Sequence, residues 1–177
     1  VSRGLGDVYK RQPNSIITND ITDIKPANGN NLWISTFHYG VDLFDTKNKC
    51  FTHYNNQTLP SLCSNKTWTI MDDGEGHLYI GHAGFGMSIL SLANNTVKNY
   101  MNSPWKSNSI PGNDVRCIYK DTHGNIWIGT EKGLSIFDDK KEEFIVPSHL
   151  PQELRNSYVF DIYQTDDDKL WIGTELN

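Results

Sequence analysis

An aromatic residue followed by isoleucine recurs four times along this sequence of 177 residues, at nearly constant spacing. The four aromatic residues are Trp33, Tyr79, Trp127 and Trp171, so the intervals between them are 46, 48 and 44 residues. When the four copies are aligned on this residue, the position nine residues earlier is isoleucine in every copy. A period of this length, with several columns that match at once, indicates a repeat architecture.

Residues 113–146 show most clearly what one copy contains. The segments DVRCIYK, IWIGT, LSIFD and EFIVP are short and rich in β-branched and aromatic residues, as strands are. The segment DTHGN, between the first two, has the Asp, Asn and Gly of a tight turn. No segment has a sustained helical period, and residues 151–156 could form one helical turn at most. Four short antiparallel strands per copy are typical of a β-propeller blade.

The sequence therefore predicts an all-β fold, a β-propeller fragment of about three and a half four-stranded antiparallel blades from a seven-bladed ring. The predicted blades are residues 14–60, 61–108, 109–152 and, incomplete, 153–177. Seven such copies need about 320 residues, so we expect the chain to be part of a longer protein. Residues 1–12 match no column, and we interpret them as a leader foreign to the propeller, which would then occupy residues 13–177. A basic N-terminal arm is the alternative for that segment.

The repeated residues are expected to be structural, because blades stack face to face and bury both faces of each sheet. Losing a buried tryptophan typically costs about 3–5 kcal/mol of stability. We expect packing rather than ligand contact for Trp33, Tyr79, Trp127 and Trp171, and for the glycines two positions later, Gly81, Gly129 and Gly173.

The segment Asp121–Phe137 reads D-x-x-G-x-(L/I)-W-I-G-T-x-x-G-L-x-x-F and resembles the two-component regulator propeller repeat. Two weaker copies run from Asn30 to Phe44 and from Gly76 to Leu90. The first copy has Ala27 in place of the Asp, and the second has Tyr79 in place of the Trp.

This resemblance implies an extracytoplasmic sensor of the hybrid two-component histidine kinases of gut Bacteroidetes. Such receptors have two seven-bladed propellers, a small β-sandwich, a membrane helix, and then kinase and regulator modules. The resemblance implies that this chain is a periplasmic portion of an inner-membrane protein, partnered by the remaining blades and domains of a homodimeric receptor. An oligosaccharide ligand would bias the dimer between signalling states through its differential affinity for them, and a phosphorelay would then control transcription. No catalytic residue is expected in this part of the receptor.

Composition and motifs exclude several classes of function. The net charge of -5 and the pI near 5.6 give no attraction for nucleic acid, so none is expected as a partner. The sequence has no H-E-x-x-H, C-x-x-C, phosphate-binding loop or G-x-S-x-G, so we expect no metal and no cofactor. The acidic run at residues 165–169 is interpreted as a solvated turn, with calcium binding as the alternative. Cys50, Cys63 and Cys117 are interpreted as small core residues, with a Cys50–Cys63 disulfide left open.

Ligand-binding candidates lie in the loops that join the second strand to the third and one blade to the next, which gather on one face of a propeller. Stacking aromatics and charged groups in these loops suit an oligosaccharide, including an acidic one met by Lys106, Lys132 and Arg155. The candidates are His38, Tyr39, His82, Phe85, Trp105, Lys106, Glu131, Lys132 and Arg155. For Trp105, a hydrophobic plug between blades is the alternative to ligand stacking.

Two other functions remain open from the sequence. The propeller could be an interaction scaffold, or the ectodomain of another signalling protein such as a diguanylate cyclase. It could also be a carbohydrate-active enzyme, since D-x-x-G-x-x-W resembles the Asp-box turn of sialidases. Sialidases bind the substrate carboxylate with three arginines, whereas only Arg116 and Arg155 lie outside the first twelve residues of this chain.

Overall fold

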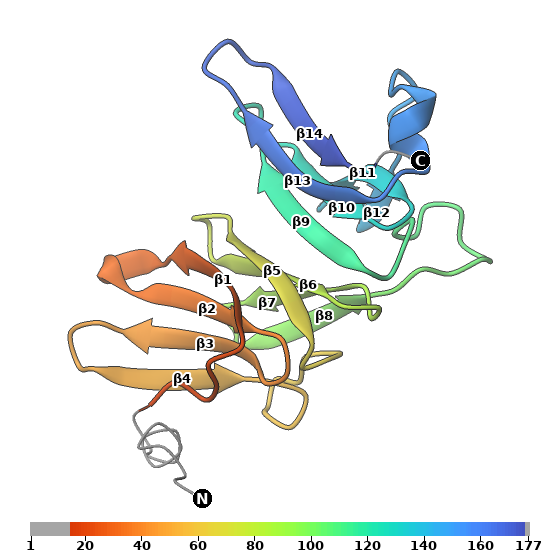
Figure 1. Cartoon of the computed structure of the whole chain (residues 1–177). Coiled ribbons are helices and arrows are strands. Elements are labelled where there is room, and N and C mark those ends of the chain that lie inside the picture. Colours follow the sequence, from red (N-terminus) through yellow and green to blue (C-terminus); the bar gives the residue numbers. More distant parts are fainter. Residues whose placement is uncertain (1–14, 176–177) are drawn as a thin grey trace, which may run out of the picture.

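The computed structural model describes residues 15–175, and these form an all-β fold of antiparallel sheets (Figure 1). The predicted leader at residues 1–12 lies outside the described residues. Within them the only helices are two short 3-10 turns, η1 (Asn28–Asn30) and η2 (Gln152–Arg155). The predicted fold class is confirmed.

Each sheet is built from strands that follow one another along the chain. The first sheet contains β1 (Ile21–Pro26), β2 (Leu32–Thr36), β3 (Gly40–Asp45) and β4 (Cys50–Tyr54). The second contains β5 (Thr67–Asp72), β6 (His77–His82), β7 (Met87–Ser91) and β8 (Thr96–Tyr100). The third contains β9 (Val115–Lys120), β10 (Ile126–Thr130), β11 (Gly133–Asp138) and β12 (Glu143–Ile145). The fourth pairs β13 (Val159–Gln164) with β14 (Leu170–Thr174).

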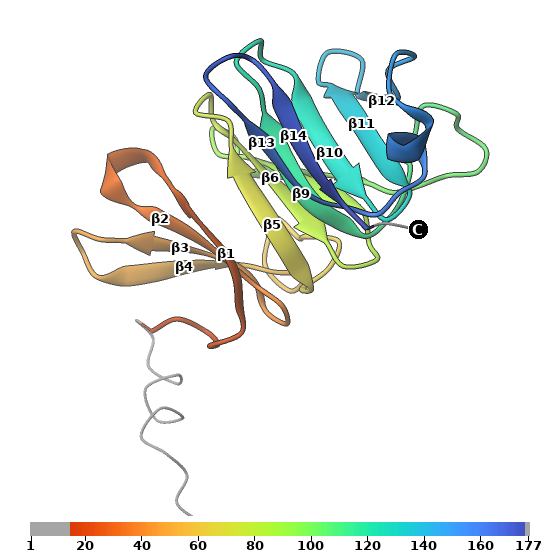
Figure 2. The same ribbon diagram turned by 45° about the horizontal axis from the view of Figure 1, so that its top comes forward.

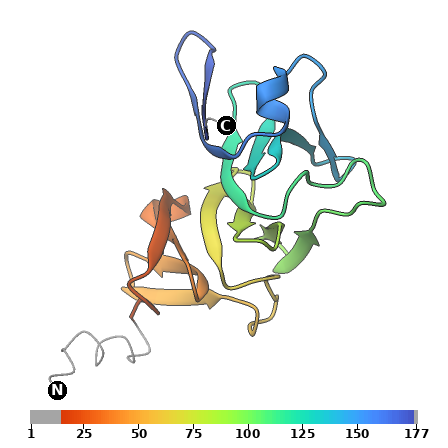
Figure 3. The same ribbon diagram turned by 45° about the vertical axis from the view of Figure 1, so that its right-hand side comes forward.

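The repeated aromatic residue lies on the second strand of every sheet, as the alignment predicts. Trp33 is on β2, Tyr79 on β6, Trp127 on β10 and Trp171 on β14. The first strands β1, β5, β9 and β13 neighbour one another in this order and form the inner side of an arc (Figure 3). The sheets therefore follow one another as propeller blades do.

Adjacent blades pack an aromatic residue of one blade against an isoleucine of the next. Trp33 shares a core cluster with Ile70, and Trp127 shares another with Ile162. The same isoleucine column occurs nine residues before each aromatic residue, so the two repeated columns are the two halves of one interface. Trp171 is 64% exposed, because in the described part of the chain no blade follows β13 and β14, which lie against the third blade (Figure 2). Ile24, on the first blade, is exposed for the matching reason.

The glycine two positions after the aromatic residue allows the next blade to come close. A Cβ on Gly81 would lie 2.8 Å from Val115 Cγ1, and a Cβ on Gly129 would lie 2.7 Å from Val159 Cγ1. Both valines begin the inner strand of the following blade. Gly173 has only ordinary contacts around its Cβ position, which agrees with the absence of a following blade among the described residues.

Another glycine lies at the start of the third strand, or directly before it, in three blades, and Gly86 shows why. Its φ is 74°, which favours glycine, and a Cβ there would lie 2.0 Å from the carbonyl oxygen of Tyr100. Its amide donates to the carbonyl of Asn113, in the connection to the third blade, over 2.7 Å. This hydrogen bond holds the turn between the second and third strands of one blade against the segment that leads to the next blade.

Candidate ligand-binding site

All four inner strands carry a β-bulge at the same repeat position. In the first blade Ile21 pairs with Thr36 and Asp23 pairs with Ser35, so Thr22 is the extra residue. The pairing skips one residue in the same way in the other three blades. The residues at this position, eleven before the repeated aromatic, are Thr22, Trp68, Arg116 and Phe160. A bulge redirects a side chain and commonly lies beside functional sites.

The bulge residues of the second and third blades form the centre of a stack that crosses all four blades. The Trp68 ring lies 4.6 Å from the ring of Phe37, which belongs to the first blade. The Arg116 guanidinium carbon lies 3.7 Å from the centre of the Trp68 ring and 5.4 Å from that of Tyr158. Tyr158 in turn stacks on Phe160 at 4.6 Å, with ring planes 12° apart. A guanidinium between aromatic faces is a favourable cation–π arrangement.

Asp114 holds this stack from one side. Its Oδ1 accepts a hydrogen bond from Trp68 Nε1 over 2.8 Å, and its Oδ2 accepts one from the Tyr158 hydroxyl. Arg116 contributes an ion pair to Asp114 at 3.5 Å and donates from Nε to the Tyr158 hydroxyl over 2.7 Å. Burial, followed by the hydrogen bond to Asp114, raises the pKa of Tyr158, so its hydroxyl stays protonated and donates.

Trp68 and Arg116 of this stack also line a concavity between the inner strands, with a volume of about 470 Å³, a size suited to a small ligand. Its walls combine both signs of charge with aromatic rings. The charged and aromatic residues that line it are Asp23, Lys25, Trp68, Arg116, Tyr119, Asp161 and Tyr163. Carboxylates, amines and hydroxyls beside aromatic faces can recognise a polyhydroxylated ligand. We call this region the axial concavity.

Three of the loop residues predicted as ligand contacts have hydrogen-bond partners within the protein. His82 is completely buried, and its Nε2 lies 2.8 Å from Ser88 Oγ, so a ligand cannot reach the ring in this structure. The Glu131 carboxylate accepts the amides of Asn113 and Asp114 over 3.1 and 2.9 Å and so orders the connection between blades. Arg155 donates to carbonyls of its own loop, those of Ser148 and Leu150.

Trp105 and Lys106 lie away from the axis. Asn108, in the same connection, accepts the amide of Phe144 from the outermost strand of the third blade over 2.9 Å. Trp105 is 94% exposed, which rules out the predicted alternative of a hydrophobic plug. Its exposed ring is free to meet a ligand, but the structure does not bring it near the axial concavity.

The remaining predicted residues are exposed at the turns between second and third strands. His38 lies 3.2 Å from Asp20 Oδ2 and is edge-on to Phe37, so it borders the stack. Tyr39 and Phe85 are 45% and 43% exposed, and Lys132 is also exposed. These turns lie on the expected face of the blades, but the residues are divided among three blades.

Loop-based reasoning missed the residues of the axial concavity, because they lie within strands. One sign was present in the sequence: Trp68 and Arg116 occupy the same repeat position, where the other copies have threonine and phenylalanine. Because this inner-strand position is polar in one copy and aromatic in another, core packing does not determine which residue type occupies it.

The described residues contain neither a disulfide nor a cluster of metal-binding side chains. Cys50, Cys63 and Cys117 are free thiols, so the alternative of a Cys50–Cys63 disulfide is wrong for this structure. Within residues 15–175, no group of three or more His, Cys, Asp or Glu side chains could hold a metal ion. No helix in that range is long and apolar enough to span a membrane.

Comparison with known proteins agrees with the repeat architecture. Residues 109–132 and 153–175 match the two component regulator propeller family. A solved extracellular domain of BT3049 from B. thetaiotaomicron, assigned as a hybrid two-component system, is 47% identical with a TM-score of 0.79. The match covers 94% of this chain and 21% of that one, so this chain spans about a fifth of its relative. No curated protein matches the chain.

Two more distant structures share the fold. The extracellular domain of BT4673, assigned to a hybrid two-component system of the same organism, is 21% identical with a TM-score of 0.70. That match covers 90% of this chain and 22% of the other. PorZ, a surface component of the type-IX secretion system of Porphyromonas gingivalis, is 12% identical with a TM-score of 0.69, over 99% of this chain and 27% of its own. The chain therefore carries repeats of the two-component regulator propeller family and is homologous to the extracellular domains of hybrid two-component systems.

Proposed function

We propose that this chain is a ligand-sensing portion of the periplasmic domain of a hybrid two-component receptor, and that its ligand is an oligosaccharide. The axial concavity is the observation that carries the proposal. It presents Tyr119 and Tyr163 as aromatic surfaces, with Lys25, Asp23 and Asp161 as polar partners. Sugar rings offer an apolar face and a rim of hydroxyls, which suits such a mixture of groups.

The signalling role is inferred from the homology and not from reactive residues within this chain. In a homodimeric inner-membrane receptor, a ligand that binds one signalling state more tightly shifts the population toward that state. The kinase and regulator modules would lie in other parts of the protein, and the phosphorelay would control transcription.

The test is calorimetric titration of the complete extracellular domain with neutral and acidic oligosaccharides. We expect Tyr163→Ala to weaken binding by roughly 10- to 100-fold, the effect of losing one stacked aromatic residue. The circular dichroism spectrum and the melting temperature of the variant are the folding control.

Trp105→Ala is the matched comparison, because it removes another exposed aromatic residue in the outer connection. If Trp105→Ala abolishes binding while Tyr163→Ala does not, the ligand binds at the loops and the assignment to the axial concavity is wrong. If the domain binds no oligosaccharide of the panel, the proposed ligand class is wrong.

A further inference from the structure

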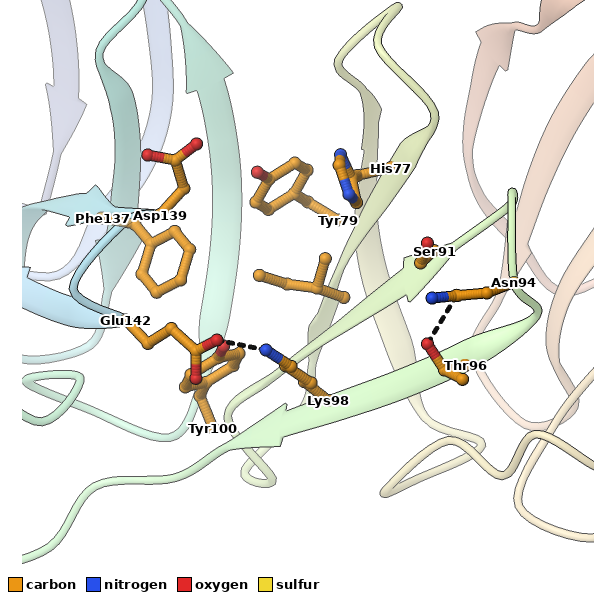
Figure 4. A pocket seen from close by; sticks show the side chains of 11 residues that line it. His77, Tyr79, Ser91, Asn94, Thr96, Lys98, Tyr100, Phe137, Asp139 and Glu142 are labelled. Carbon is orange, nitrogen blue, oxygen red and sulfur yellow. Dashed lines mark hydrogen bonds and ion pairs between the residues drawn. The ribbon is translucent and has the colours of Figure 1, made fainter.

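A second cavity lies outside the axial concavity, in the groove between the second and third blades (Figure 4). Its volume is about 330 Å³. One wall comes from the second blade and includes Tyr79, Lys98 and Tyr100, and the other comes from β11 and the turn after it, with Phe137, Asp139 and Glu142. We call this cavity the interblade groove.

The groove lies at the blade whose repeated aromatic residue is tyrosine instead of tryptophan. In the first and third blades the indole N–H has a carboxylate partner: Trp33 donates to Asp72 over 2.9 Å, and Trp127 donates to Asp121 over 2.8 Å. The Tyr79 ring is equally buried, at 3% exposure. Its hydroxyl, however, borders the groove and has no hydrogen-bond partner among the described residues (Figure 4).

The Tyr79 hydroxyl is a donor under ordinary conditions. Burial, followed by the nearby carboxylates of Asp73 and Asp139, raises its pKa well above the usual value. A protonated phenol without a protein partner at the wall of a cavity can donate a hydrogen bond to a bound molecule.

The rest of the groove combines aromatic edges with paired charges. Tyr79 and Tyr100 both meet Phe137 edge to face, with ring centres 6.3 and 5.2 Å apart. Lys98, from the outermost strand of the second blade, forms an ion pair with Glu142 in the turn between β11 and β12. Lys98 is thus neutralised, while the exposed Asp139 carboxylate has no hydrogen-bond or ion-pair partner among the described residues and lines the groove (Figure 4).

We propose that the interblade groove binds a neutral sugar ring, as a site separate from the axial concavity. A polyol can accept a hydrogen bond from the Tyr79 hydroxyl and donate hydrogen bonds to Asp139 and Glu142. Its C–H face can lie against the aromatic edges. An anionic sugar is disfavoured, because the Asp139 carboxylate would repel it and the Lys98 ammonium is already paired with Glu142. The volume of the groove is at the lower end of small-ligand sites, so one ring rather than a long chain is its occupant.

The experiment is ligand-observed NMR and calorimetric titration of the complete extracellular domain, with glucose, galactose, mannose and glucuronate as probes. We expect at least one neutral hexose to bind and glucuronate to bind more weakly. Tyr79→Phe removes only the hydroxyl and should weaken hexose binding by about 3- to 10-fold, the effect of one hydrogen bond. Asp139→Ala, at an exposed turn, should weaken it similarly without affecting the fold.

Tyr79→Trp is the decisive variant, because it restores the residue of the first and third blades and fills space at the groove. It should abolish hexose binding while the protein stays folded. Tyr163→Ala, in the axial concavity, should leave hexose binding at the groove unchanged, so failure of this proposal is distinguishable from failure of the first. The inference is overturned if no neutral hexose binds, if glucuronate binds more tightly, or if Tyr79→Trp leaves binding intact.

Discussion

At the repeated aromatic position, the side chain is buried in each of the first three blades, but its hydrogen bonding differs between them. Trp127 donates to Asp121 of its own blade, whose carboxylate also accepts the amides of His123 and Asn125 over 2.9 and 2.8 Å. The first blade has Ala27 where the third has Asp121, and there the indole of Trp33 donates to Asp72 of the next blade. The D-x-x-G-x-x-W turn is therefore a structural element here.

His82 makes stability depend on pH. Burial lowers its pKa to about 4, from an ordinary value of 6.5, and the ring is held by Ser88, whose hydroxyl donates to Asn99 over 2.6 Å. The folded protein takes up this proton less readily than the unfolded chain, so protonation favours unfolding. The contribution to the free energy of unfolding is complete above about pH 6.5 and is lost as the pH falls toward 4, by about 3 kcal/mol.

Urea unfolding between pH 4 and 7 measures this effect. His82→Gln should be less stable than the parent at pH 7, yet its stability should fall less steeply as the pH is lowered. His149→Gln, at an exposed position, is the control and should keep the slope of the parent. An unchanged slope in His82→Gln would mean that other groups cause the pH dependence.

At the scale of elements, neighbouring blades are joined at two levels. At the bulges, the stack of Phe37, Trp68, Arg116 and Tyr158 connects the inner strands. At the opposite end of the inner strands, one repeat position, seven residues before the aromatic, makes a different bond at each interface. Asp72 accepts from Trp33, Lys120 donates to the Asp73 carbonyl over 3.2 Å, and Gln164 accepts from the Thr122 amide over 2.9 Å. The geometry of the interface repeats, while its polar chemistry does not.

The bulge stack should contribute to stability as a coupled pair. We expect a double-mutant cycle of Trp68→Ala and Arg116→Ala to give a coupling energy of about 0.5–2 kcal/mol, the range of cation–π pairs at partly buried sites. The measurement is the free energy of unfolding of the parent, both single variants and the double variant. Strictly additive effects would show that the guanidinium and the indole are adjacent without stabilising each other.

At the scale of the whole molecule, the arc has two unequal ends. The β13–β14 sheet exposes Phe160 at 46%, Tyr163 at 62% and Trp171 at 64%, whereas the repeated aromatic residues of the first three blades are at most 6% exposed. In repeat arrays the terminal units depend on a single neighbour and are the least stable.

The 177-residue chain, expressed alone, should therefore exchange amide hydrogens fastest in β13 and β14, and should bind a hydrophobic dye. Hydrogen exchange followed by mass spectrometry gives the first result, with β5 to β8 as the internal reference because that blade has a neighbour on each side. Uniform protection across all four sheets, together with no dye binding, would contradict this expectation.

The repeat itself determined the fold. Each blade needs its own isoleucine and its own aromatic residue to pack against its neighbours. The local sequence therefore predicts the strands, their order and the faces that they bury. The same holds for Gly81 and Gly129, whose missing side chains are required by the valines of the next blade. The axial concavity and the interblade groove were decided only by the tertiary structure. Trp68, Arg116 and Tyr158 belong to three blades, and Tyr79 and Glu142 to two, so no local pattern encodes their meeting. Their proximity results from the stacking of blades, which places residues more than forty positions apart side by side.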